Sequence, residues 1–175
     1  MTEIYSQTEM TCVMDHIEKH FGPVSGIFHE VVSPDIHVDI CVIPPQEEKD
    51  YYTLVTMGMG AHRMNVPAAL KEKRLDRAEL VIALPKDWEI QSKDEEWYWP
   101  IRLLKDLARL PVQMDTWLGW GHVVDNPQPY ADNVQFVSSP LVPPRFKAKT
   151  ENGNSLSGVF HEQILYLASG LQRLP

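Results

Sequence analysis

The sequence predicts an α+β fold in which helices pack on a mixed, mostly antiparallel β-sheet. Two observations predict it. Apolar residues recur at steps of three and four near residues 8–21 and 96–110, as they do on one face of a helix. The other apolar runs are short, rich in β-branched and aromatic residues, and end at proline or glycine, which is typical of strands. With 175 residues, the chain fits a single domain over residues 1–175.

The first helix is expected from Thr8 to Phe21. Ser6 and Glu9 have the S-x-x-E spacing of a capping box, which marks the beginning of a helix. Gly22-Pro23 interrupts the helical pattern and marks its end.

The histidine pair and the two cysteines of the chain predict neither a metal centre nor a disulfide. His16 and His20 lie four residues apart, a spacing that metal ligands use. No third ligand lies nearby and zinc needs three or four, so we interpret the pair as part of a solvated helix face. Cys12 and Cys41 follow no export signal, so both are expected to be reduced, buried and inert.

Three strands are expected next, over Val24–Val32, Ile36–Ile43 and Tyr51–Met57. The second and third should pair as an antiparallel hairpin across the charged loop Gln46–Asp50. The second strand alternates, so its side chains divide between two faces: Ile36, Val38 and Ile40 on one, and His37, Asp39 and Cys41 on the other.

Polar residues of this second strand form a candidate site. Asp35, His37 and Asp39 share one face if the strand begins at Asp35. Such a set could bind a metal or support acid–base chemistry. The alternative is a histidine that a carboxylate orients on a half-exposed sheet. We favour this alternative, because charged clusters do not always mark active sites.

The middle of the chain adds one more strand. Gly58-Met59-Gly60 is not a phosphate-binding loop, because the G-x-x-x-x-G-K-[ST] pattern is missing and no helix signal follows. The mixed-charge run Lys71–Arg77 is expected to form a solvated loop or a short helical turn. Arg77–Leu84 is a strand with two distinct faces: Ala78, Leu80, Ile82 and Leu84 on one, and Glu79 on the other.

The stretch Glu96–His122 organises the rest of the chain, since it holds four of the five tryptophans. Each tryptophan removes roughly 150–250 Å² from water when buried. A helix should begin near Trp97, with Pro100 in its first turn. It should end near Leu110, because Pro111 biases the preceding residue away from helix.

After this helix, two glycines flank an aromatic residue. Gly119 and Gly121 on either side of Trp120 predict a turn that presents a wide side chain. Trp117 is expected in the core. For Trp120 two interpretations stay open, a surface anchor and a core residue, because tryptophan is often only partly buried.

The last third of the chain predicts further strands. Val123-Val124 begins a short extended piece, and Val134–Val142 forms a strand. Asn152-Gly153 predicts a hairpin turn. Val159–Leu167 fits a final strand, although its apolar residues also fit a helix stripe.

Charge and composition exclude some functions. The chain has 16 Lys and Arg against 24 Asp and Glu, a net charge of −8, so phosphate backbones are repelled and nucleic acid is not expected as a partner. No apolar run approaches the roughly 20 residues that span a bilayer, and the first ten residues do not form a signal peptide. We expect a cytoplasmic protein.

Six blocks of sequence, in a fixed order, cover most of the chain: HVDICVIPP (37–45), YYTLVTMGM (51–59), RAELVIALPKDW (77–88), WPIRLLKDLARLP (99–111), DTWLGWGH (115–122) and VSSPLVPP (137–144). Together they resemble the suppressor-of-fused domain family. The resemblance implies a mixed α/β, sandwich-like domain without established catalysis. Animal members bind a transcription-factor peptide that adds as a strand, and bacterial members resemble immunity or interaction proteins associated with toxin systems.

This short chain is similar to the bacterial type. Animal members carry Gly-Asp-His where this chain has Trp120-Gly121-His122. The acidic side chain that helps to hold their peptide is therefore missing, and the animal ligand is not carried over.

The favoured function is a non-catalytic protein-binding module, an immunity or interaction protein that neutralises a toxin or another partner. The partner would add as a strand to an open sheet edge or bind in a cleft. The expected partner-binding residues are Trp117, Trp120, His122, His37, Asp39 and Tyr52. Neither a cofactor nor a metal is expected, the partner is a protein or peptide, and the chain is a monomer or weak homodimer.

Two alternatives stay open. The first is a metal-assisted hydrolase that uses a His/Asp cluster: Asp35, His37, Asp39, His62 and His122. The sequence has no HExxH, G-x-S-x-G or CxxC motif, and Ser25 and Ser33 stand in no recognisable triad. The second alternative is an oligomerising structural subunit, in which the sheet edge would be occupied by other copies.

Overall fold

A computed structural model describes residues 2–132, 134, 138–142 and 163–167 of the chain. Its elements, in order, are α1 (Gln7–Phe21), β1 (Gly26–Phe28), β2 (Asp39–Ile43), β3 (Tyr51–Met57), the 3₁₀ segments η1 (Met59–Ala61) and η2 (Ala68–Lys73), β4 (Ala78–Pro85), α2 (Glu95–Met114), β5 (Val123–Asp125), β6 (Ser138–Val142) and β7 (Gln163–Leu167).

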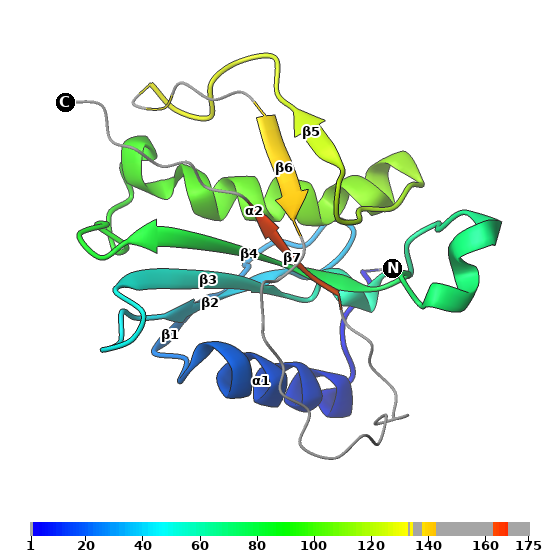
Figure 1. The fold of residues 1–175 in the computed structure, drawn as a ribbon, viewed down its shortest axis with the longest axis horizontal. Helices are drawn as coiled ribbons and strands as arrows, with labels where there is room; N and C mark the ends of the chain where they lie inside the picture. Colours follow the sequence, from blue (N-terminus) through cyan, green and yellow to red (C-terminus); the bar gives the residue numbers. More distant parts are fainter. Residues whose placement is uncertain (1, 133, 135–137, 143–162, 168–175) are drawn as a thin grey trace.

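The strands form one mixed sheet in the order β1-β2-β3-β4-β7-β6-β5 (Figure 1). Every neighbouring pair is antiparallel except β4 and β7, which are parallel. The predicted α+β class and mostly antiparallel sheet are confirmed, as is the β2–β3 hairpin. In this order, β1 and β5 are the two edge strands.

The helices lie on opposite faces of the sheet, α1 below it and α2 above it in the view of Figure 1. Alternation along the strands supplies both faces with apolar side chains. The larger cluster, around α2, takes Ile40 and Val42 from β2, whereas the smaller cluster, around α1, takes Cys41 and Ile43. The alternation predicted for β2 is therefore confirmed.

The beginning of α1 agrees with the sequence. Ser6 is the N-cap, its side chain accepts from the backbone of Glu9, and the Glu9 side chain returns a contact to the Ser6 backbone. Cys12 differs from the prediction, because it is exposed on this helix, although neither cysteine is in a disulfide. Burial raises the pKa of the Cys41 thiol to about 12, as expected for an inert cysteine.

Several predicted boundaries are wrong. The strand expected over Ile36–Ile43 begins only at Asp39, so Asp35 is not part of β2. α2 continues past Pro111 to Met114, because Pro111 is buried within the helix and its carbonyl still accepts from Asp115 and Thr116. Apolar packing of the helix therefore outweighs the local cost of a proline. The strand expected over residues 24–32 is shorter: β1 has three residues, since the chain then turns away to place Glu30 against α2.

Part of the prediction lies outside the described residues. The expected Asn152-Gly153 turn falls outside the described residues. Of the expected strand Val159–Leu167, only residues 163–167 are described, and they form β7. Among the described residues, no helix is both long and apolar enough to cross a membrane.

Candidate functional site

The loop between α2 and β5 carries the aromatic residues singled out from the sequence. Asp115, with φ 46°, caps α2, and the chain then passes from half-buried to buried residues before it reaches the exposed Trp120. The ring of Trp117 packs partly buried against the core and meets the ring of His122 edge-on at 4.5 Å. Leu118 is buried, whereas Trp120 is 61% exposed. Trp120 therefore projects from a loop that its neighbours anchor.

β5, which follows this loop, forms one edge of the sheet. Leu141 donates to the His122 carbonyl at 2.8 Å and accepts from Gly121 at 2.7 Å, and Val123 then lies opposite Pro140. In an antiparallel ladder, alternate residues turn their backbone groups toward the partner strand. The N–H and C=O of Val123 therefore face outward, as do those of Asp125. No other described strand covers this side.

The side chains of β5 alternate as well. Val124 packs against the core, whereas Val123 is 57% exposed. An exposed valine, an exposed tryptophan and outward backbone groups thus lie together at this edge. We call the outer side of Val123–Asp125 together with Trp120 the β5 edge.

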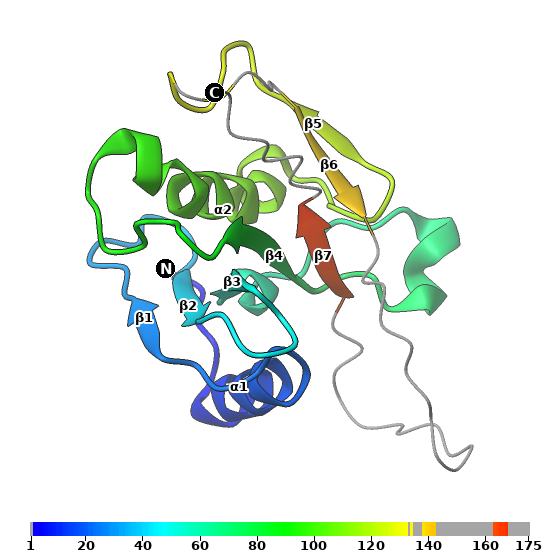
Figure 2. The ribbon, with the colours of Figure 1, turned by 60° about the vertical axis from the view of Figure 1, so that its left-hand side comes forward.

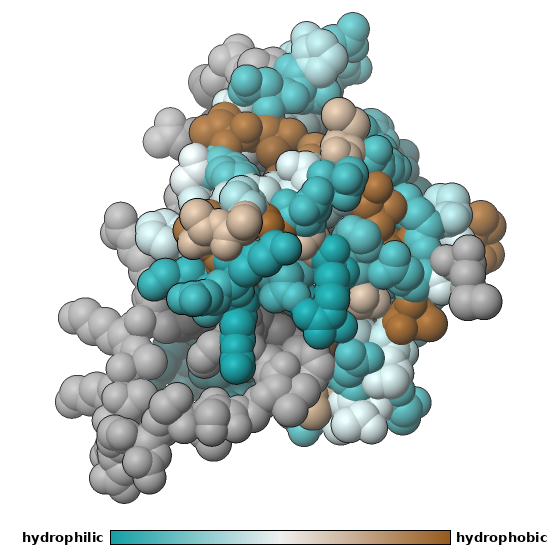
Figure 3. Space-filling model, turned by 90° about the vertical axis from the view of Figure 1, so that its right-hand side faces the viewer, coloured by the Kyte–Doolittle hydropathy of each residue, from teal (hydrophilic) through white to brown (hydrophobic). Residues whose placement is uncertain are grey.

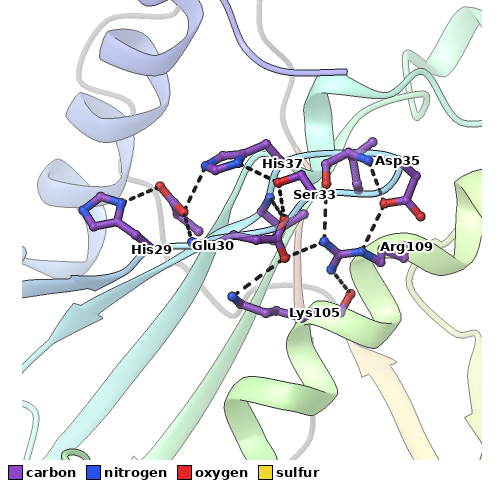
Figure 4. A network of polar contacts seen from close by, with 10 residues as sticks. His29, Glu30, Ser33, Asp35, His37, Lys105 and Arg109 are labelled. Carbon is purple, nitrogen blue, oxygen red and sulfur yellow. Dashed lines mark hydrogen bonds and ion pairs between the residues drawn. The ribbon is translucent and has the colours of Figure 1, made fainter. Parts of the chain in front are cut away.

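His37, which contacts Asp39, lies in a different cluster (Figure 4). Asp39 is buried at the start of β2 and accepts from the Glu30 backbone at 2.8 Å. His37 Nε2 lies 3.2 Å from one of its oxygens, and His29 Nδ1 lies 3.0 Å from the other. Asp39 therefore orients two imidazoles, as the favoured interpretation of this strand predicts.

The centre of this cluster is an ion pair that no local sequence pattern indicated. The Arg109 guanidinium, from α2, lies 2.5 Å from Glu30 and 3.1 Å from Asp35. Burial alone would raise the pKa of Glu30, but hydrogen bonds from the Val38 backbone, Ser33 and Arg109 lower it. The loop between β1 and β2 is thereby fixed to α2.

Ser33 also differs from the prediction, because it does contact a histidine. Its Oγ lies 2.8 Å from His37 Nδ1 and 2.8 Å from Glu30 Oε2. The Ser33 hydroxyl donates to Glu30 Oε2, and the donor in its contact with His37 Nδ1 depends on the tautomer of the histidine. A hydroxyl hydrogen that points to Glu30 is not presented to His37, so this geometry does not by itself make Ser33 a nucleophile.

Tyr52 lies near the other edge of the sheet. It lines a hollow of about 340 Å³ together with β1 and Ile90. The six predicted partner-binding residues therefore fall into three groups. Among the described residues, no hydrogen bond or ion pair joins His37 or Asp39 to Trp117, Trp120 or His122.

The constellation suggested for a hydrolase is not assembled. His62 Nδ1 contacts Glu3 at 3.1 Å, His122 packs on Trp117, and Asp35 pairs with Arg109, so only His37 and Asp39 of this set are in contact. In the described part of the chain, no group of three or more His, Cys, Asp or Glu side chains is arranged to hold a metal ion. His16 and His20 have ring centroids 4.4 Å apart on α1.

Glu79 is a second buried acid whose role the sequence did not indicate. Its carboxylate accepts from the hydroxyls of Tyr5 and Thr56, at 2.7 and 2.5 Å, and from the backbone N–H groups of Gly58 and Gly60, at 2.9 and 3.1 Å. Burial raises the pKa of Glu79, against the lowering effect of these hydrogen bonds. The alternation along β4 correctly predicted that Glu79 lies opposite the apolar face of the strand, but it did not predict the hydrogen-bond partners of Glu79.

Three comparisons relate the chain to known proteins. The family of the suppressor of fused protein matches residues 34–165, more than half of the chain. An uncharacterised protein of Ureaplasma parvum, UU111, is 27% identical over 126 residues, which cover 70% of this chain and 59% of that protein. The chain thus spans less than two thirds of this relative.

A solved structure of a suppressor-of-fused homologue from Neisseria gonorrhoeae has the same fold. It aligns with a TM-score of 0.60 at 15% identity, over 93% of this chain and 77% of the other. The shared fold and the family match over residues 34–165 agree with the resemblance of the sequence blocks. The chain belongs to the suppressor of fused family.

Proposed function

We propose that this protein is a non-catalytic binding module whose β5 edge receives an extended segment of another protein. The observation that carries the proposal is the position of Trp120, 61% exposed and one short turn before a strand whose outer backbone groups meet no described strand. Backbone hydrogen bonds to an added strand supply affinity, and an aromatic anchor supplies selectivity.

The rest of the site supports binding rather than catalysis. His37 and Ser33 are engaged with Asp39 and Glu30, which hold a loop in place. We infer that the bound protein is a toxin or a similar partner that this chain neutralises in the cytoplasm. The resemblance to bacterial interaction proteins supports this finer proposal.

Capture from a lysate of the source organism, followed by reconstitution with the purified captured protein, tests the proposal. Trp120→Ala should weaken capture strongly while the melting temperature stays nearly unchanged, because an exposed side chain contributes little to the core. Val123→Pro should do the same, since it removes an outward N–H without removing a bond of the β5–β6 ladder. Tyr51→Ala, at an exposed aromatic residue of β3, is the control.

Equal capture by wild type, Trp120→Ala and Val123→Pro would refute the proposed edge. For the toxin, growth is the readout: expression of the captured protein should arrest cells, and co-expression of wild type but not of Trp120→Ala should restore growth. If wild type and Trp120→Ala both restored growth, or if the captured protein did not arrest growth, neutralisation through Trp120 would be contradicted.

A further inference from the structure

A cluster of positive charge lies at the C-terminal end of η2. Lys71, Lys73 and Arg74 are all exposed, and Arg74 adopts the left-handed conformation with φ 54°. We call these three residues the basic turn. Within the described part of the chain, no ion pair joins any of them to a carboxylate. Glu72, the one acidic residue between them, leaves the turn with a net positive charge.

Apolar anchors hold the basic turn in place. Leu70 and Leu75, on either side of it, pack partly buried against the larger core cluster. Arg74 donates its backbone N–H to Lys71 at 3.2 Å, and Met64 donates to Asp76 at 2.8 Å at the base of the segment. The three charged side chains are thus presented outward from a backbone that the core positions.

The chain just before η2 contacts the loop that carries Trp120. Asn65 donates to the Thr116 carbonyl at 3.1 Å, and Leu118 donates to Met64 Sδ at 3.4 Å. Figures 1 and 2 both place η2 and the loop after α2 at the same end of the molecule. Seen from this end, hydrophilic side chains gather at the centre of the face, with apolar side chains above them (Figure 3).

This arrangement identifies the chemistry of a complementary partner. The chain carries a net charge of −8, so an unpaired basic cluster beside an apolar edge differs from the rest of the molecule. We propose that the segment bound at the β5 edge is acidic, and that its Asp or Glu side chains contact Lys71, Lys73 and Arg74. The inference rests on the proposed function and specifies its ligand.

A protein segment fits this surface better than a nucleic acid does. Nucleic-acid-binding domains usually carry a strong overall positive charge, whereas this chain has a pI of about 5.3 and repels a polyanion at long range. A short acidic peptide avoids most of that repulsion. It also uses the outward backbone groups of Val123 and Asp125, which a phosphate chain cannot pair as a strand.

A random peptide library selected on the immobilised full chain tests the inference. Enriched peptides should carry net negative charge, and their affinity should fall as sodium chloride is raised, because salt screens exposed charges. Lys73→Glu should weaken their binding by about tenfold, through repulsion between like charges. Lys93→Glu exchanges another exposed lysine with the same change of net charge and should leave affinity unchanged.

The outcomes separate this inference from the proposed function. Enriched peptides that are neutral or basic but still require Trp120 and Val123 would overturn the proposal of an acidic ligand. They would still support binding at the β5 edge. Equal losses of peptide affinity in Lys73→Glu and Lys93→Glu would also overturn the proposal of an acidic ligand. Peptides that bind independently of Trp120 and Val123 would contradict the proposed function itself. A thymidine oligonucleotide that binds as tightly as the peptides, and is weakened by Lys73→Glu, would replace the protein ligand with nucleic acid.

Discussion

Glu30 and Arg109 join the loop after β1 to α2 through a contact of 2.5 Å, although they lie 79 positions apart in the sequence. Both side chains are less than one tenth exposed. Removing one partner of a buried pair leaves an uncompensated charge in the interior, which costs more than the pair itself contributes. The pair therefore governs the stability of the whole loop that includes His37.

Arg109→Met should lower the free energy of unfolding by about 3–5 kcal/mol. Urea denaturation of the purified chain measures this loss. Lys86→Met, at an exposed ion pair with Asp50, is the control and should hardly change the unfolding midpoint. A loss no larger than that of the control would show that Glu30 is not held by Arg109.

Acid should weaken the same loop. The pKa of Glu30 lies below its ordinary value of 4.5, so the folded state binds this proton less readily than the unfolded state does. Its stabilising contribution is present above pH 4.5 and is lost as the pH falls through the lowered pKa. Glu30→Gln should flatten this part of the stability–pH curve. If Glu30→Gln lost stability in acid as steeply as the wild type, the acid dependence would not come from the lowered pKa of Glu30.

Glu79 should show the opposite dependence. Its pKa is raised by burial, so its contribution to stability is greatest below pH 4.5 and decreases as the pH rises through the folded-state value. Glu79→Leu leaves four buried donors without their acceptor and should cost roughly 3 kcal/mol or more. Glu79→Gln keeps an acceptor oxygen, so it should cost less and remove the pH dependence. Equal losses in both variants would show that the acceptor oxygen kept by glutamine does not stabilise the fold, and would contradict this explanation.

Gly58 occupies a position that only glycine fits. Its φ is +133°, and a Cβ would lie 1.9 Å from the His37 carbonyl oxygen. Gly58→Ala should therefore destabilise the protein by at least about 1–3 kcal/mol. Gly26→Ala is the matched control, because a Cβ there meets no atom within 4 Å, and it should be neutral or slightly stabilising. Thermal denaturation of the two variants gives the comparison, and equal melting temperatures would argue against this turn geometry.

The sequence predicts the helices and strands of this protein better than it predicts the contacts between their side chains. Periodicity located α1, β2, β3 and β4, because buried faces impose steps of two or of three and four on apolar residues. It misplaced the end of α2, where packing around Pro111 overrides a local preference. Short edge strands such as β1 bury little, so they leave a weak pattern.

The candidate site was only partly predictable for a related reason. The flanking glycines indicated that Trp120 is presented by a turn, and its exposure agrees with the surface interpretation. The pairing of Glu30 with Arg109 depends on how α2 lies across the sheet, which no local pattern encodes. The same holds for Ser33, whose contact with His37 arises from the fold of the β1–β2 loop.

Amide hydrogen exchange of Val123 and Asp125, with and without the captured partner, tests the central claim most directly. Both amides should exchange readily in the free protein and become protected when the partner binds, while the amides of β1 should not change. Protection confined to β1, or a bound partner that leaves the amides of Val123 and Asp125 unprotected, would contradict it.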